Sequence, residues 1–211
     1  MIRKVKNKTE WSDIRKICCE TGKSGAPIER ERWKFFGEHW VGPYETLLAD
    51  WTWVATQHAS NGSEEVIGYL TGCPDSAQLA RKRILRFDFP LVLAILHKRY
   101  PINMDVRRYL KRRFKLEKSP EELFPENVNS MLRSLYPAHL HINLTEKARG
   151  NGTGRKLVET YFEALREKRV CGVHVHCGSA PVRFYERLGF EILHSVEVRP
   201  GVSVYCLGIA L

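Results

Sequence analysis

A glycine-rich segment carries the residues whose types and spacing point most directly to chemistry. It follows a run that alternates like a strand (140–144) and precedes a run with helical spacing (155–165). The first turn of a helix has amide groups without internal partners, and glycines let a ligand approach the backbone. The sequence therefore predicts a loop that binds a phosphate or pyrophosphate. The loop residues are Arg149, Gly150, Asn151, Gly152, Thr153, Gly154 and Arg155.

Two familiar phosphate-loop patterns fit this segment poorly. The Walker pattern needs Gly-Lys-Ser/Thr, but Gly154 is followed by Arg155 and Lys156. The dinucleotide pattern needs G-x-G-x-x-G, whereas these glycines alternate with single residues. Three glycines taken alone also fit a plain tight turn between a strand and a helix.

The segment instead resembles the coenzyme A loop of the GNAT acetyltransferase family, in which Arg-x-x-Gly-x-Gly follows a strand and opens a helix. A second motif, residues 184–190, reads Phe-Tyr-Glu-Arg-Leu-Gly-Phe and is similar to the family's F-Y-x-x-x-G-F signature. The two motifs occur in the family's order, and the resemblance covers residues 136–193. Residues 136–144 are also similar to acetyltransferase-like domains found in, or related to, the C-terminal part of O-GlcNAcase proteins.

The resemblance implies an α/β (α+β) fold with a GNAT-like mixed central sheet flanked by helices. A predicted hairpin with Asn61-Gly62 at its turn suits the centre of this sheet. Residues 75–135 read as helices, and we expect a helical insertion between the third and fourth strands of a single domain spanning 1–211. Within the insertion, Phe89-Pro90 is expected to break a helix.

The resemblance also implies that acetyl-CoA binds along the first motif. The loop amides would hold the pyrophosphate. Backbone groups of the preceding strand would pair with the pantetheine arm and offer an amide to the thioester oxygen. The strand residues concerned are Ile142, Asn143 and Leu144.

The second motif supplies a candidate catalytic residue. Tyr185 aligns with the signature tyrosine, which implies a general acid for the leaving thiolate. A core tyrosine packed beside Phe184 is the alternative. The family often has Asn and Ala where this chain has Gly178 and Pro181, so Ser179 is expected to take over a polar contact to the pantetheine or thiol.

Histidines gather around the expected acceptor side. His139, His141 and Asn143 share one face of their strand, and His174 and His176 share a face of the next. Parallel pairing, which the resemblance implies, would bring the histidines together. They could be structural, could contact the acceptor or act as its base (His139, His141 or His176), or could bind zinc. The family requires no metal, and we expect none.

The formal charge of +10 suits a protein that binds anionic coenzyme A. Basic clusters in the insertion fit solvated helix faces or a surface for nucleic acid or another anionic partner. Without a membrane-length apolar run, a secretory signal or a Cys-x-x-Cys pair among the six cysteines, the chain is expected to be cytoplasmic and to have no membrane among its partners. A monomer or a homodimer fits.

The resemblance therefore implies an acetyltransferase that moves an acetyl group from acetyl-CoA to a primary amine of the acceptor by direct transfer in a ternary complex. Two alternatives remain open. One is a non-catalytic acetyltransferase-like binding module, and the other is a nucleic-acid-binding protein that uses the basic insertion.

Overall fold

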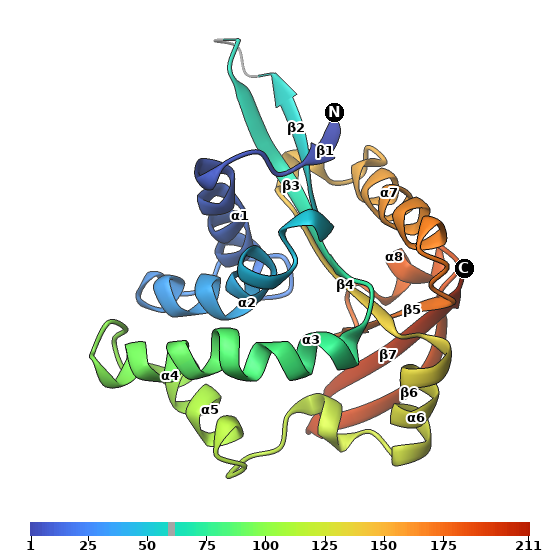
Figure 1. The fold of residues 1–211 in the computed structure, drawn as a ribbon. Coiled ribbons are helices and arrows are strands. Elements are labelled where there is room, and N and C mark those ends of the chain that lie inside the picture. The colour runs from blue at the N-terminus through green and yellow to red at the C-terminus, as the bar shows by residue number, and fades with distance from the viewer. Residues whose placement is uncertain (59–61) are drawn as a thin grey trace.

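The computed structural model describes residues 1–58 and 62–211. In this part of the chain, seven strands form one sheet in the order β1-β2-β3-β4-β5-β7-β6, with helices on both faces (Figure 1). The predicted mixed sheet flanked by helices is confirmed. The strands are β1 (Ile2–Lys4), β2 (Thr52–His58), β3 (Glu64–Cys73), β4 (Ala138–Leu144), β5 (Gly172–Cys177), β6 (Glu191–Arg199) and β7 (Val202–Ala210).

Helices α1 and α2 cover one face of the sheet, and α7 covers the other (Figure 1). The helices are α1 (Lys8–Thr21), α2 (Trp33–Leu47), α3 (Ser76–Arg83), α4 (Phe89–Leu96), α5 (Met104–Arg113), α6 (Glu126–Leu135), α7 (Thr153–Glu167) and α8 (Val182–Glu186). The shorter turns are η1 (Arg30–Arg32), η2 (Ala49–Trp51), η3 (Ile84–Asp88), η4 (Pro120–Leu123) and η5 (Glu146–Ala148). Among the described residues, no helix combines the length and apolarity that a membrane crossing requires.

The pairing of β4 with β5 is the feature that creates the site. These strands run parallel, but they pair only at Ala138↔Val173 and His139↔His174. On its other edge, β4 stays paired with β3 as far as Leu144. Beyond His139, therefore, β4 and β5 separate and leave a gap in the sheet.

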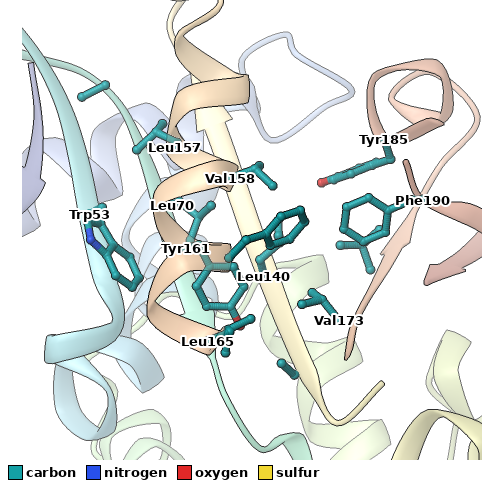
Figure 2. Packing of buried hydrophobic residues seen from close by; sticks show 14 of the residues in the cluster. Trp53, Leu70, Leu140, Leu157, Val158, Tyr161, Leu165, Val173, Tyr185 and Phe190 are labelled. Atoms are coloured by element: carbon teal, nitrogen blue, oxygen red, sulfur yellow. The ribbon is translucent and has the colours of Figure 1, made fainter. Parts of the chain in front are cut away.

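Helix α7 packs on the sheet through its predicted apolar stripe (Figure 2). Leu157, Tyr161 and Leu165 are fully buried. The Tyr161 hydroxyl lies 2.8 Å from the carbonyl oxygen of His139 and 2.9 Å from that of Cys73. A Cβ at Gly72 would lie only 2.3 Å from the Tyr161 ring, so this close packing requires glycine in β3.

The helices of the insertion pack against two different parts of the domain. The α4–α5 pair packs around Phe35 of α2, and the buried residues there are Phe87, Leu91, Ile95, Val106 and Tyr109. Helix α6 packs instead near Cys206 of β7, through Phe124, Val128 and Leu132. The insertion is therefore integrated with the rest of the molecule.

The predicted helix break at Phe89-Pro90 is wrong. The chain passes from α3 through the π turn η3 into α4, and the Phe89 amide donates to the Ile84 carbonyl. Pro90 lies in the first turn of α4, where its missing amide hydrogen has little consequence. The wider π turn absorbs the change in hydrogen bonding, so the helix continues. In the predicted hairpin, Asn61 lies outside the described residues.

Candidate active site

A cleft of about 870 Å³ opens where β4 and β5 separate. Its walls come from the end of β4, the end of β5, the loop before α7, the segment around α8 and the connection between α1 and α2. Helix α2 adds the aromatic side chains of Phe36 and Trp40. The cleft thus combines both sequence motifs with residues from the N-terminal part of the chain.

Backbone amides of β4 face this gap. The Thr145 amide donates to the Ile67 carbonyl at 2.9 Å, toward β3. Successive amides of a strand point to opposite sides, so those of Leu144 and Ile142 point toward the gap. Because β5 pairs with β4 only up to His139, the amides of Leu144 and Ile142 are donors for a bound molecule.

The loop before α7 has the backbone that the glycine pattern predicted. Gly150 and Gly152 have φ values of 77° and 82°, in the left-handed region that favours glycine. A Cβ at either position would meet no atom within 4 Å, so backbone conformation rather than space selects glycine here. The Asn151 side-chain oxygen accepts from the Thr153 amide at 3.1 Å and from its hydroxyl at 2.6 Å. These bonds restrain the start of α7, whose N-cap residue is Gly152 and whose dipole is positive at that end.

Gly154 and Arg149 hold this loop against its neighbours. A Cβ at Gly154 would lie 3.1 Å from the Phe184 ring and 3.2 Å from the side chain of Leu144. The Arg149 guanidinium donates to the carbonyls of Leu144 at 3.2 Å and Gly25 at 3.0 Å. Arg149 thus joins the loop to the end of β4 and to the α1–α2 connection, and it leaves a positive charge at the cleft.

Tyr185 lines the cleft and is 6% exposed. Its ring packs against Phe184 and Phe190, while its hydroxyl is directed away from Phe190 and toward Val158 (Figure 2). Burial raises the pKa of the Tyr185 phenol, so it keeps its proton at neutral pH. Burial also raises the pKa of Cys18 and of Cys177, the cysteines in the cleft wall, to about 11.

His141 belongs to a hydrogen-bonded network on the α1–α2 side of β4. The Asn143 amide nitrogen lies 2.8 Å from the Tyr69 hydroxyl and 3.1 Å from Nε2 of His141. The imidazole stacks on Trp40, with ring centroids 5.6 Å apart. Burial lowers the pKa of His141 to about 4, so its ring is neutral near pH 7.

His139 is held in a different way. Its Nε2 lies 2.9 Å from the Tyr44 hydroxyl and its Nδ1 lies 2.6 Å from Oγ of Ser76. Its ring is 5.8 Å from that of His174, which is 5.2 Å from that of His176. Parallel pairing thus brings His139, His174 and His176 together, whereas the ring of His141 stacks on Trp40. Within the described ranges, however, no group of three or more His, Cys, Asp or Glu side chains is placed to hold a metal ion.

Most of the predicted site residues meet at the cleft. Among the described residues, Asn151, Thr153, Ser179 and His139 are not part of its lining, and Gly178 and Ala180 line it beside Ser179. The sequence motifs missed the contribution of α2 and of the α1–α2 connection, because no local pattern ties these residues to the motifs. The predicted residues that line the cleft are His141, Ile142, Asn143, Leu144, Arg149, Gly150, Gly152, Gly154, Arg155, His176 and Tyr185.

Comparison with known proteins agrees with this geometry. Residues 128–192, which include both motifs, match the family model described as "Acetyltransferase (GNAT) domain". This part of the chain is thus similar to the GNAT family of acetyltransferases. The comparisons do not support the closer resemblance to O-GlcNAcase-type domains.

Solved structures of similar fold cover the whole chain. The structure of SsHAT is 29% identical with a TM-score of 0.73, covering 100% of this chain and 97% of that chain. A GCN5-related N-acetyltransferase from Kribbella flavida is 12% identical with a TM-score of 0.54, covering 100% and 97%. The NatC complex bound to Gag peptide and CoA contains a chain that is 12% identical with a TM-score of 0.52, covering 100% and 98%.

Proposed function

We propose that this protein transfers an acetyl group from acetyl-CoA to a primary amine in a direct ternary complex. The observation that carries the proposal is the gap between β4 and β5, which the amides of Ile142 and Leu144 face beside the start of α7. The matched GNAT domain and a structure of this fold solved with CoA support the same ligand.

The residues of the cleft fit an elongated anionic molecule. Its volume of about 870 Å³ lies within the range of sites for cofactors. Arg149, Arg155 and Arg187 line it and supply positive charge. The positive φ values of Gly150 and Gly152 and the open space beside them leave the amides of the loop and of the first turn of α7 accessible to a pyrophosphate.

Acetyl-CoA supplies an activated thioester, and acetyl transfer forms a C–N bond as the C–S bond breaks. The Ile142 or Leu144 amide would stabilise the negative charge that develops on the acetyl oxygen, and such a donor typically contributes about 10²–10³ in rate. The Tyr185 hydroxyl, which keeps its proton, would donate it to the departing sulfur. The amine loses its proton to solvent or to a nearby base.

The protonation of the cleft residues supports direct transfer. Cys18 and Cys177 remain thiols at neutral pH because burial raises the pKa of each, and a thiol is a poor nucleophile. His141, with a pKa near 4, is a weak base, and Asn143 already bonds its Nε2. We therefore assign His141 to contacts with the acceptor instead of to proton abstraction, together with His176, which also lines the cleft.

The test is calorimetric titration with acetyl-CoA and with free coenzyme A. Wild-type protein is expected to bind both with micromolar affinity, and Gly152→Asp is expected to abolish binding because it places a carboxylate at the pyrophosphate. Gly201→Asp is the matched control: Gly201 also has positive φ (73°) and open space around it, but lies between β6 and β7. No binding by the wild type, or equal loss in both variants, would overturn the cofactor assignment.

Turnover distinguishes an enzyme from a non-catalytic module. An enzyme should release coenzyme A from acetyl-CoA when amines are supplied, which a thiol-reactive dye detects. Binding that Gly152→Asp abolishes, without release of coenzyme A with any of a broad panel of amines, would favour a binding module instead.

A further inference from the structure

The excess positive charge of this protein lies in one part of the insertion. Residues 81–118 contain thirteen lysines and arginines but only three acidic residues. Their excess of ten positive charges equals the formal charge of the whole chain, so the remaining residues are balanced. The acids in this segment are already paired with arginines, and the pairs are Arg83–Asp88, Arg113–Asp88, Arg32–Asp105 and Arg112–Glu117.

Helix α4 and the π turn before it have two apolar faces, of which only one is packed. Phe87, Leu91 and Ile95 are buried against α2 and α5. A second set of apolar residues is exposed, at a spacing of four, four and three along the same helix. We call this set the outer stripe, and it comprises Leu85 (76% exposed), Phe89 (59%), Leu93 (40%) and Leu96 (67%).

Basic residues flank the outer stripe at both ends. Lys82 and Arg86 lie on the N-terminal side, and Lys98 and Arg99 follow Leu96, all of them exposed. A helix that is apolar on all sides is normally buried. The exposed apolar face of α4 therefore suggests a surface that binds a membrane or another molecule. Helices α3 and α4 cross the lower half of the view in Figure 1, above α5, whereas α7 lies at the upper right.

The outer stripe and the positive charge beside it together indicate which kind of partner this surface binds. A second copy of the chain would bring two strongly positive segments together, which is repulsive. Single-stranded nucleic acid binds through aromatic side chains on which bases stack, but three of the four stripe residues are leucines. An anionic lipid surface satisfies both features, because it attracts basic residues and accepts apolar side chains at the level of its headgroups.

We propose that this surface of α4 binds the headgroup region of anionic membranes, with the outer stripe at the boundary between headgroups and acyl chains. The protein would lie on the membrane without crossing it. The proposed membrane surface includes no residue that lines the acetyl-CoA cleft. Membrane binding can therefore be tested independently of the proposed acetyl transfer.

The apolar contribution is tested by sedimentation with phosphatidylcholine vesicles that contain or lack phosphatidylserine. Wild-type protein is expected to sediment with the anionic vesicles only. Phe89→Ser/Leu93→Ser should weaken partitioning by about tenfold or more, because it removes two apolar side chains from the interface. Ile192→Ser/Val202→Ser is the matched control, since these exposed apolar residues lie on β6 and β7, and it should partition like the wild type.

The contribution of the basic residues to vesicle binding is tested by removing two of their charges. Lys98→Gln/Arg99→Gln should weaken partitioning about fivefold for each charge removed, and added salt should weaken the wild type in the same direction. The matched variant is Lys168→Gln/Arg169→Gln, because this exposed pair also follows a helix and also has one residue with positive φ. It should retain binding within about twofold, because its charges lie outside the proposed surface.

Three results would overturn the proposal. These are failure of the wild type to bind anionic vesicles, equal binding with and without phosphatidylserine, and equal effects of the α4 variants and their controls. Salt-dependent binding of the wild type to an acidic protein or to nucleic acid, without binding to vesicles, would also reject the lipid as occupant. Circular dichroism and acetyl-CoA titration check that each variant is folded. If Phe89→Ser/Leu93→Ser is unstable, Lys98→Gln/Arg99→Gln still tests the proposal.

Discussion

Burial determines the protonation state of the side chains that line the cleft. Tyr185 packs among aromatic rings, and desolvation raises the pKa of its phenol. Desolvation acts in the opposite direction on His141, whose protonated form it disfavours. Near pH 7 the cleft therefore holds a proton donor in Tyr185 and a neutral imidazole in His141.

Replacing Tyr185 by Phe tests the role of its hydroxyl. Under the proposed mechanism, kcat should fall by a factor of up to about 10²–10⁴, because the leaving sulfur loses its proton donor. The Kd for acetyl-CoA should change little, since the aromatic ring and its packing remain. Tyr100→Phe serves as the control, because Tyr100 lies in the insertion outside the cleft lining. Unchanged turnover in Tyr185→Phe would remove this hydroxyl from the mechanism.

Arg149 is expected to position the cofactor loop. In Arg149→Gln, the carbonyls of Leu144 and Gly25 lose a charged donor. A hydrogen bond to a charged group contributes enough that the Kd for acetyl-CoA should rise about tenfold. Titration measures this change, and limited proteolysis reports whether the α1–α2 connection becomes more accessible. The control is Lys147→Gln, because Lys147 pairs with Glu65 on the surface (2.9 Å). Equal affinities for both variants would contradict the positioning role.

At the scale of single elements, β4 links the pH dependence of stability to the site. Burial lowers the pKa of His139 to about 3 and that of His141 to about 4, from an ordinary value of 6.5. Below pH 6.5 the unfolded chain therefore binds protons at these residues that the folded chain does not. The free energy of unfolding should decrease as the pH falls from about 6.5 toward 4.

His139→Gln tests this dependence. Burial lowers the pKa of three described histidines, His39, His139 and His141. Because the variant removes one of them, its unfolding free energy should change less steeply with pH than that of the wild type. Urea unfolding over the range from about pH 7 to about pH 5 measures the slope. His58→Gln, at the exposed end of β2, is the control and should keep the wild-type slope. Identical slopes for all three proteins would show that His139 is not responsible.

The elements that could be predicted from sequence are those determined by local rules. The alternation of 140–144 and the spacing of Leu157, Tyr161 and Leu165 identified β4 and α7 correctly. The helix break predicted at Pro90 was wrong, because the effect of a proline depends on whether the preceding turn widens into a π turn. No local residue pattern predicts that widening. The contribution of Trp40 to the cleft depends on how α2 packs across β4, which is a contact between distant parts of the chain.

At the scale of the whole molecule, Phe35 joins the insertion to the rest of the domain. It is 1% exposed and packs between α2, α4 and α5, and Arg32 binds Asp105 of α5 with two hydrogen bonds of 2.7 and 2.9 Å. These contacts favour one cooperative unit over a separate helical domain.

Phe35→Ala tests that cooperativity. The substitution should lower the free energy of unfolding by roughly 3–5 kcal/mol while leaving a single transition. Phe114→Ala is the matched control, because Phe114 is exposed, and its effect should lie within about 0.5 kcal/mol. Calorimetry with near-ultraviolet circular dichroism would reveal two transitions if the insertion unfolds independently, and that result would contradict a single domain.

The narrow junction between β4 and β5 has a consequence for how the molecule fluctuates. Within the described residues, backbone pairing joins the β1–β4 part of the sheet to the β5–β7 part at two residue pairs, so this junction should open more readily than the rest of the sheet in amide hydrogen exchange. A ligand seated in the gap would bridge them and slow exchange on both sides at once. A higher cofactor concentration would then make opening of the sheet between β4 and β5 less frequent, and it would slow proteolysis of the protein.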